Sequence, residues 1–114
     1  RGLEMILNNN NIGNIFVAKK NEKTIGMVIL LYTVSTALGE RVALLEDMVV
    51  FPNERKLGIG SMLLDHAVKY AIEKKCKRIT LLTDKTNIRA QKFYEQHKFN
   101  RSSMISFRMI INNR

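Results

Sequence analysis

Residues 55–60 read Arg-Lys-Leu-Gly-Ile-Gly, and this stretch decides the fold of the chain. It follows the apolar run 43–51 and precedes a helical pattern that begins near Gly60. A strand, a glycine-containing turn and a helix in this order gather backbone N–H groups into an anion site. The glycines leave room for a phosphate, and the helix N-terminus supplies unpaired donors and about half a positive charge. The sequence therefore predicts a ligand that carries a pyrophosphate.

The length and composition fit one small domain over residues 1–114. Apolar residues make up 46% of the chain and charged residues 25%, as in most globular proteins. The net charge of +9 favours anionic ligands, although a solvated basic surface explains it equally well. The basic residues are spread along the chain and aromatic residues are only 7%, so we expect no nucleic acid partner.

The cysteine count and the apolar runs indicate where the protein works. Cys76 is the only cysteine, so no internal disulfide can form, which suits a reducing cytoplasm. No run approaches the ~20 apolar residues of a membrane span, and no secretory signal is visible. We therefore expect a cytoplasmic protein with no membrane partner. The spacing of His, Cys and carboxylate residues suggests no metal site.

Hydrophobic periodicity predicts the order β-β-β-α-β-α-β and hence an α/β fold with a mixed sheet. The expected strands lie at 15–18, 24–34, 43–50, 78–83 and 104–111, and the expected helices at 58–75 and 87–97. A tight turn follows the first helix, so the strands on either side of it are expected to be parallel. Residues 2–7 are interpreted as the last turns of a helix that the Asn run 8–11 ends.

Three motifs in this order and spacing resemble the GNAT N-acetyltransferase superfamily. The Arg-x-x-Gly-x-Gly of residues 55–60 is similar to the coenzyme A pyrophosphate loop of that family. It lacks the third glycine of a dinucleotide-binding loop and the Gly-Lys-Ser/Thr of a Walker loop. Residues 45–52 look like the central strand of the family, and residues 87–95, Asn-x-x-Ala-x-x-Phe-Tyr-Glu, like its later helix. The resemblance runs from about Ile15 to the C-terminus and implies a GNAT-like fold.

The resemblance implies acetyl-CoA as the cofactor and gives each motif a role. The backbone of the central strand would pair with the pantetheine arm, as an added strand pairs with a sheet edge. The amides of the glycine loop would hold the pyrophosphate, and the Asn that opens the second helix would hydrogen-bond the cofactor arm. The residues predicted to bind cofactor are therefore Met48, Val49, Val50, Arg55, Lys56, Leu57, Gly58, Ile59, Gly60 and Asn87.

Glu46 and Tyr94 are the predicted catalytic residues. An alkyl amine with a pKa near ~10.4 must lose a proton before it attacks, and the Glu46 carboxylate can take that proton directly or through water. Asp47 is expected on the opposite face, because strand side chains alternate. By the resemblance, Tyr94 lies near the thioester sulfur, where its hydroxyl can protonate the leaving thiolate. Backbone N–H groups of a splayed central strand could stabilise the oxyanion.

Each of these residues also has a purely structural interpretation. Glu46 could be a surface carboxylate or a partner for Arg41. Asn87 is a natural N-cap for its helix, and both of its roles can hold together. Tyr94 could simply pack in the core with Phe93.

The chain departs from the family pattern in three places. Lys56 stands in the loop where a glycine is common. Lys98 replaces the glycine that usually follows the second helix, at a position that is often left-handed. Family members also usually begin with one more strand and one or two helices, which wall the acceptor pocket. Here the first strand and the helices are expected to be missing.

We therefore predict an N-acetyltransferase that transfers the acetyl group of acetyl-CoA to a primary amine by direct attack in a ternary complex. The acceptor is expected to be a small-molecule or peptide amine. Residues 32–39 are weakly similar to the diamine-acetylating branch of the superfamily. Within the enzymes, a diamine N-acetyltransferase and a protein N-acetyltransferase are therefore the two alternatives. A non-catalytic CoA-binding or regulatory module is the alternative, and the presence of Glu46 and Tyr94 counts against it. A homodimer is expected because an exposed sheet edge tends to find a partner.

Overall fold

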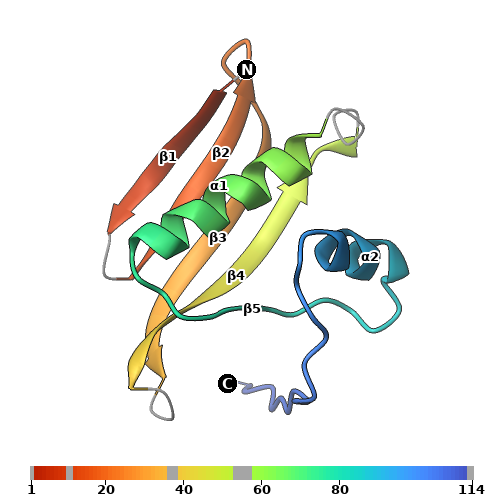
Figure 1. Cartoon of the computed structure of the whole chain (residues 1–114). Helices are drawn as coiled ribbons and strands as arrows, with labels where there is room; N and C mark the ends of the chain where they lie inside the picture. The colour runs from red at the N-terminus through yellow and green to blue at the C-terminus, as the bar shows by residue number, and fades with distance from the viewer. Residues whose placement is uncertain (1, 10–11, 36–38, 53–57, 113–114) are drawn as a thin grey trace. The chain divides into compact units, whose positions relative to one another are not determined.

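The computed structural model of the chain describes residues 2–9, 12–35, 39–52 and 58–112, and Figure 1 shows their arrangement within each part of the chain. The chain divides into two compact units, Arg1–Leu82 and Thr83–Arg114. We call them the N-terminal unit and the C-terminal unit and describe each by itself.

The N-terminal unit contains a five-stranded sheet in the order β1-β2-β3-β4-β5. Its strands are β1 (Gly2–Asn9), β2 (Gly13–Lys20), β3 (Lys23–Ser35), β4 (Glu40–Val50) and β5 (Ile79–Leu81). The first four strands pair in antiparallel fashion, whereas β5 is parallel to β4 and is reached through helix α1 (Ile59–Glu73). The predicted mixed sheet with parallel strands around this helix is confirmed.

Residues 2–7 were predicted to be helical, and this prediction is wrong. They belong to β1, which pairs with β2 from Gly2↔Lys19 to Asn9↔Gly13. Leu, Met and Glu are good helix formers, but helix propensity is a weak preference, and pairing with a neighbouring strand overrides it here. The observed order is therefore β-β-β-β-α-β-α, with an extra strand at the start where the first strand was expected to be missing.

Helix α1 lies along one face of the sheet, as Figure 1 shows, and forms the core with it. Its buried residues fall on one stripe: Ile59, Leu63, Leu64, Ala67 and Ala71. The Phe16 ring of β2 meets the rings of His66 and Tyr70 at centroid distances of 5.0 and 5.2 Å. Val28 lies opposite Phe16 on β3 and is fully buried, so this face of the sheet is the core face.

Gly26 allows the first turn of α1 to approach the sheet. A β-carbon at this position would lie 3.0 Å from Leu63 Cδ1, 3.1 Å from the Val49 carbonyl oxygen and 3.3 Å from Ile59 Cγ2. Gly26 pairs with Val50, the last residue of β4. The N-terminus of α1 therefore lies at the end of β4.

Both helices end in the same kind of left-handed turn. After α1, Lys75 has φ 64°, its N–H donates to the Ile72 oxygen, and the Cys76 N–H donates to the Ala71 oxygen. This pair of hydrogen bonds is a Schellman motif with lysine where glycine is usual. The turn directs the chain into β5.

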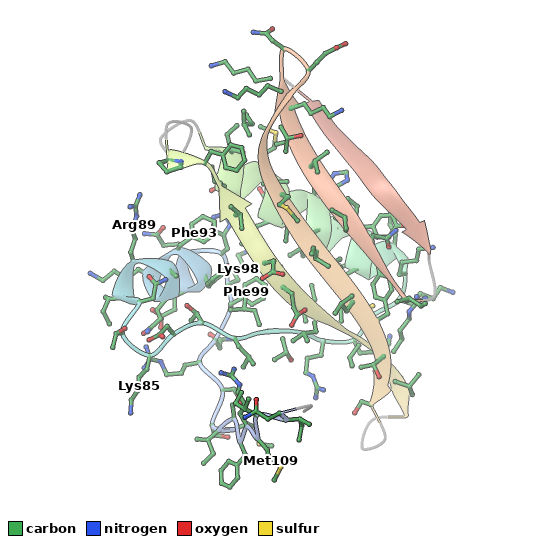
Figure 2. The ribbon with its side chains drawn as sticks, turned by 180° about the vertical axis from the view of Figure 1, so that it is seen from behind. Lys85, Arg89, Phe93, Lys98, Phe99 and Met109 are labelled. Atoms are coloured by element: carbon green, nitrogen blue, oxygen red, sulfur yellow. The ribbon has the colours of Figure 1, made fainter. Side chains whose placement is uncertain are left out.

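The C-terminal unit holds helix α2 (Ile88–Gln96) and the chain that follows it. Lys98 has φ 72°, its N–H donates to the Glu95 oxygen, and the Phe99 N–H donates to the Tyr94 oxygen. The prediction that Lys98 lies at a left-handed cap is therefore confirmed. Figure 2 shows Lys98 and Phe99 side by side at the end of this helix.

Residues 104–111 were predicted to form a last strand, and within the described chain they do not. They carry no regular secondary structure, and the sheet ends at β5. Their large apolar side chains are mostly exposed, with Phe107 at 89% and Met109 at 81%. Alternating apolar residues are compatible with a strand, but a strand forms only when a neighbour supplies the hydrogen bonds.

Candidate functional site

A β-bulge in β4 is the centre of the candidate site in the N-terminal unit. The pairing of β3 with β4 shifts between Met27↔Val49 and Ile29↔Glu46. Two residues, Asp47 and Met48, therefore oppose one residue of β3, and Asp47 has a left-handed backbone with φ 49°. Bulges redirect backbone groups away from the ladder, so β4 is splayed where the cofactor arm is expected.

The bulge also decides how Glu46 and Asp47 must be interpreted. Simple alternation would place the two carboxylates on opposite faces, but alternation holds only up to Glu46, because the bulge begins at Asp47. The sequence alone did not reveal this break. Asp is among the few residues that tolerate a left-handed backbone, and that tolerance is the one signal that could have indicated it.

Glu46 does not pair with Arg41. Glu46 lies opposite Ile29, on the face away from α1, and its side chain is exposed. Arg41 lies opposite Val34 on the core face, and its guanidinium carbon is 4.4 Å from the centroid of the Tyr32 ring. The proposed ion pair between the two is therefore wrong.

The edge of β4 beside the bulge has no neighbouring strand in the described sheet. β5 pairs only with residues 43–45 of β4, from Ala43↔Ile79 to Leu45↔Leu81. In residues 46–50, which include the predicted cofactor contacts Met48, Val49 and Val50, the described sheet pairs Glu46, Val49 and Val50 with β3 and places no other strand beside them. An open edge of this kind can accept an extended ligand by backbone hydrogen bonds.

The N-terminus of α1 lies at the same end of β4. Gly58 is its N-cap, has a left-handed backbone with φ 73°, and makes no side-chain capping hydrogen bond. A β-carbon on Gly58 would meet no atom within 4 Å, so the backbone conformation and not crowding favours glycine there. Ile59 and Gly60 form the first turn of the helix, and the predicted loop residues Arg55, Lys56 and Leu57 lie outside the described residues.

Asn87 begins α2 in the C-terminal unit. Its Oδ1 accepts a hydrogen bond from the Ala90 N–H at 3.0 Å, so the predicted N-cap role is confirmed. This bond leaves the side-chain amide nitrogen as the group that can donate to a ligand.

Asp84 shapes the turn before α2. Its carboxylate accepts hydrogen bonds from the Thr86 N–H at 2.9 Å and the Thr86 hydroxyl at 2.8 Å, and these bonds lower the pKa of Asp84. The Asp84 carbonyl oxygen accepts from the Asn87 N–H at 3.0 Å. These hydrogen bonds within the turn fix its shape, and the bond to the Asn87 N–H fixes the position of the Asn87 backbone relative to the turn.

Tyr94 is half-buried in the C-terminal unit. Its ring contacts those of Phe93 and Phe99 at centroid distances of 5.3 and 5.8 Å. Burial raises the pKa of Tyr94, so the hydroxyl stays protonated at neutral pH. The packing role is real, and it leaves Tyr94 in the protonation state that a proton donor requires. A site that joins Tyr94 with the residues of the N-terminal unit stays a prediction.

In the described part of the chain, no helix is long and apolar enough to cross a membrane. Among the same residues there is no group of three or more His, Cys, Asp or Glu side chains that could hold a metal ion.

Comparisons with known proteins agree with these features. The sequence profile of the Acetyltransferase (GNAT) family matches residues 3–99. An uncharacterized N-acetyltransferase of Bacillus subtilis, YhfO, is 35% identical over 85 residues, which are 75% of this chain and 57% of YhfO. Streptothricin acetyltransferase A of Bacillus subtilis is 40% identical over 57 residues, which are 50% of this chain and 33% of that protein. The chain thus spans little more than half the length of YhfO.

Solved structures share the fold. The crystal structure of a transcriptional regulator from Bacillus halodurans has a TM-score of 0.81 and 32% sequence identity, and the match covers 91% of this chain and 69% of that one. An aminoglycoside acetyltransferase from a soil metagenomic sample has a TM-score of 0.83 and 24% sequence identity. That match covers 93% of this chain and 70% of the other one. The second likeness is a likeness of fold alone.

Proposed function

The chain belongs to the GNAT acetyltransferase family, and from this premise we propose that it is an acetyl-CoA-dependent N-acetyltransferase. The acetyl group passes to a primary amine by direct attack in a ternary complex. The observation that carries the proposal is the splayed end of β4, where the bulge at Asp47, the open strand edge and the N-terminus of α1 meet.

The N-terminal unit supplies the proposed cofactor contacts. β5 does not extend beside residues 46–50 of β4, which supports pairing of the backbone there, at Met48 in particular, with the pantetheine arm. The left-handed Gly58 and the first turn of α1 support binding of the pyrophosphate, because unpaired N–H groups and the helix dipole attract an anion. The side chain of Arg55 would add positive charge nearby.

Two side chains would move the protons. Glu46 is an exposed carboxylate beside the bulge and would accept the proton that the attacking amine loses. The N–H groups of the bulge would stabilise the oxyanion of the tetrahedral intermediate. Tyr94 would then protonate the leaving thiolate, and its raised pKa keeps the hydroxyl ready to do so.

The acceptor is proposed to be the primary amine of a small molecule or peptide. The similarity over 57 residues to a protein named streptothricin acetyltransferase favours the small-molecule acceptor. A diamine or a protein N-terminus is the alternative within this class.

A non-catalytic CoA-binding module is the second candidate function. The observation that favours it is the 32% identity to a protein described as a transcriptional regulator. Such a module would bind acetyl-CoA at the same edge of β4 without turnover.

The experiment is an acetyl-transfer assay on the purified chain. Release of CoA thiol from acetyl-CoA is followed in the presence of a panel of primary amines, with Gly58→Glu as the variant that should lose cofactor binding. Amine-dependent thiol release that Gly58→Glu abolishes supports the enzyme. Binding of acetyl-CoA without thiol release from any amine supports the regulatory module instead.

A cytoplasmic homodimer is part of the same proposal. The free thiol of Cys76 suits a reducing compartment. In the described sheet β5 is an edge strand that pairs only with β4, and an edge of this kind favours association with a second copy. Light scattering on the purified protein tests the dimer, and a monomeric mass at micromolar concentration contradicts it.

A further inference from the structure

A hydrogen-bonded network in the C-terminal unit surrounds the turn that carries Asn87. Its centre is Gln91, one turn into α2. The Gln91 amide nitrogen donates to the Lys85 carbonyl oxygen at 2.9 Å and to the Asp84 carbonyl oxygen at 3.1 Å. Because the Asp84 oxygen also accepts the Asn87 N–H, Gln91 and Asn87 are joined through one carbonyl group.

Arg101 fixes the orientation of the Gln91 amide. Its Nη2 donates to Gln91 Oε1 at 2.9 Å. If the amide were flipped, its oxygen would face two carbonyl oxygens and its NH₂ group would face a guanidinium, and both pairings are repulsive. The Schellman turn at Lys98 reverses the chain after α2, which is how Arg101 reaches a residue ten positions earlier. With Arg101 in place, only one amide orientation is stable.

The network determines where Asn87 can donate. The Asn87 side chain is held at Oδ1 by Ala90, and its backbone is held by Asp84. If Gln91 released the two carbonyl groups, the turn 84–86 would keep its bonds to Thr86 and to the N–H groups of Asn87 and Ile88, but it would lose the side-chain bonds that tie it to the second turn of α2. The amide nitrogen of Asn87 would then sample more positions.

We propose that Gln91 and Arg101 are positioning residues that hold Asn87 where its amide can donate to the pantetheine arm of the cofactor. This inference rests on the proposed function, because Asn87 must contact acetyl-CoA for its position to matter. Neither Gln91 nor Arg101 needs to touch the cofactor. They reduce the entropy that the Asn87 side chain loses when the cofactor binds.

The test measures kcat and the KM for acetyl-CoA in single variants of the full chain. Gln91→Ala and Arg101→Ala should raise KM roughly threefold to tenfold, the scale of one hydrogen bond, and change kcat by less than about twofold. Arg101→Lys keeps a cationic donor and should restore KM to within about twofold of the unsubstituted chain. Lys92→Ala is the control, because Lys92 is an exposed residue of the same helix outside the network.

Gln91→Glu separates the two halves of the network. The carboxylate keeps its attraction to Arg101 but places an oxygen against the carbonyl groups of Asp84 and Lys85. It should therefore raise KM at least as much as Gln91→Ala. A KM unchanged by Gln91→Glu would overturn the proposal.

The ligand-free chain provides a second readout that does not depend on turnover. In nuclear magnetic resonance spectra, Gln91→Ala should shift the side-chain amide signals of Asn87 and accelerate hydrogen exchange at the Ala90 N–H, whereas Lys92→Ala should change neither. Unchanged Asn87 signals, or a loss of kcat with KM unchanged, would overturn the inference alone. If the unsubstituted chain fails to bind acetyl-CoA, the proposed function fails and the inference fails with it.

Discussion

At the scale of a single residue, replacing Tyr94 tests whether its hydroxyl group donates the proton to the leaving thiolate. Tyr94→Phe removes the hydroxyl but keeps the ring contacts with Phe93 and Phe99. Turnover should fall about tenfold to a hundredfold while the affinity for acetyl-CoA stays nearly unchanged. The active form is protonated and burial raises the pKa of Tyr94, so activity should persist at neutral pH and fall as pH rises through that pKa. A pH profile of kcat measures both effects, and unchanged turnover in the variant removes Tyr94 from the donor role.

Replacing Glu46 tests in the same way whether its carboxylate takes the proton from the attacking amine. Glu46→Gln keeps the shape of the side chain and removes the base. The loss in kcat/KM should be greatest at low pH, because the amine, with an ordinary pKa of about 10.4, is then most fully protonated. Glu40→Gln is the matched control, since Glu40 is an exposed carboxylate at the start of the same strand. An equal loss at every pH would contradict the role of Glu46 as a base.

At the scale of the secondary-structure elements, the left-handed turn after α1 leads to a prediction about stability. Lys75 has φ 64°, where a β-carbon costs about 1–2 kcal/mol, and a glycine there would lose about 0.5–1 kcal/mol in unfolded-state entropy. Lys75→Gly should therefore stabilise the chain by about 0.5–1 kcal/mol. Lys74→Gly is the control and should destabilise it, because Lys74 has φ −79°. Thermal unfolding followed by circular dichroism measures both, and a lower Tm for Lys75→Gly contradicts the account.

Elements that depend on local signals could be predicted from the sequence. Residues close together in the chain determine three such features: the apolar stripe of α1, the cap at Asn87 and the left-handed turn at Lys98. Elements that depend on a partner strand could not. Residues 2–7 are a strand because β2 is beside them, and residues 104–111 are not a strand in the described chain because no ladder receives them.

The candidate site divides in the same way. The strand, the glycine-containing turn and the helix α1 that follows it could be predicted from the glycine spacing and the apolar residues, whereas the left-handed N-cap at Gly58 is known from the structure. The bulge at Asp47 depends on how β3 pairs with β4, and the network around Gln91 depends on the return of the chain after α2. Neither feature has a periodic signal in the sequence, because each arises from contacts between separate segments.

At the scale of the whole molecule, the net charge of +9 and the open end of β4 point to one kind of ligand. Acetyl-CoA carries several phosphate charges, and a basic protein attracts such an anion over distances that salt shortens. The N-terminal unit contains every described residue proposed to bind the pyrophosphate and the strand-like arm, except Asn87. Binding of the cofactor is therefore the property on which the proposed chemistry depends.

Calorimetric titration of the purified chain with acetyl-CoA tests this claim most directly, with NAD and ATP titrated in parallel. We predict saturable binding of acetyl-CoA that weakens in Gly58→Glu, and at most weak binding of NAD and ATP. Equal affinity for all three ligands, or acetyl-CoA binding that Gly58→Glu leaves unchanged, would contradict it.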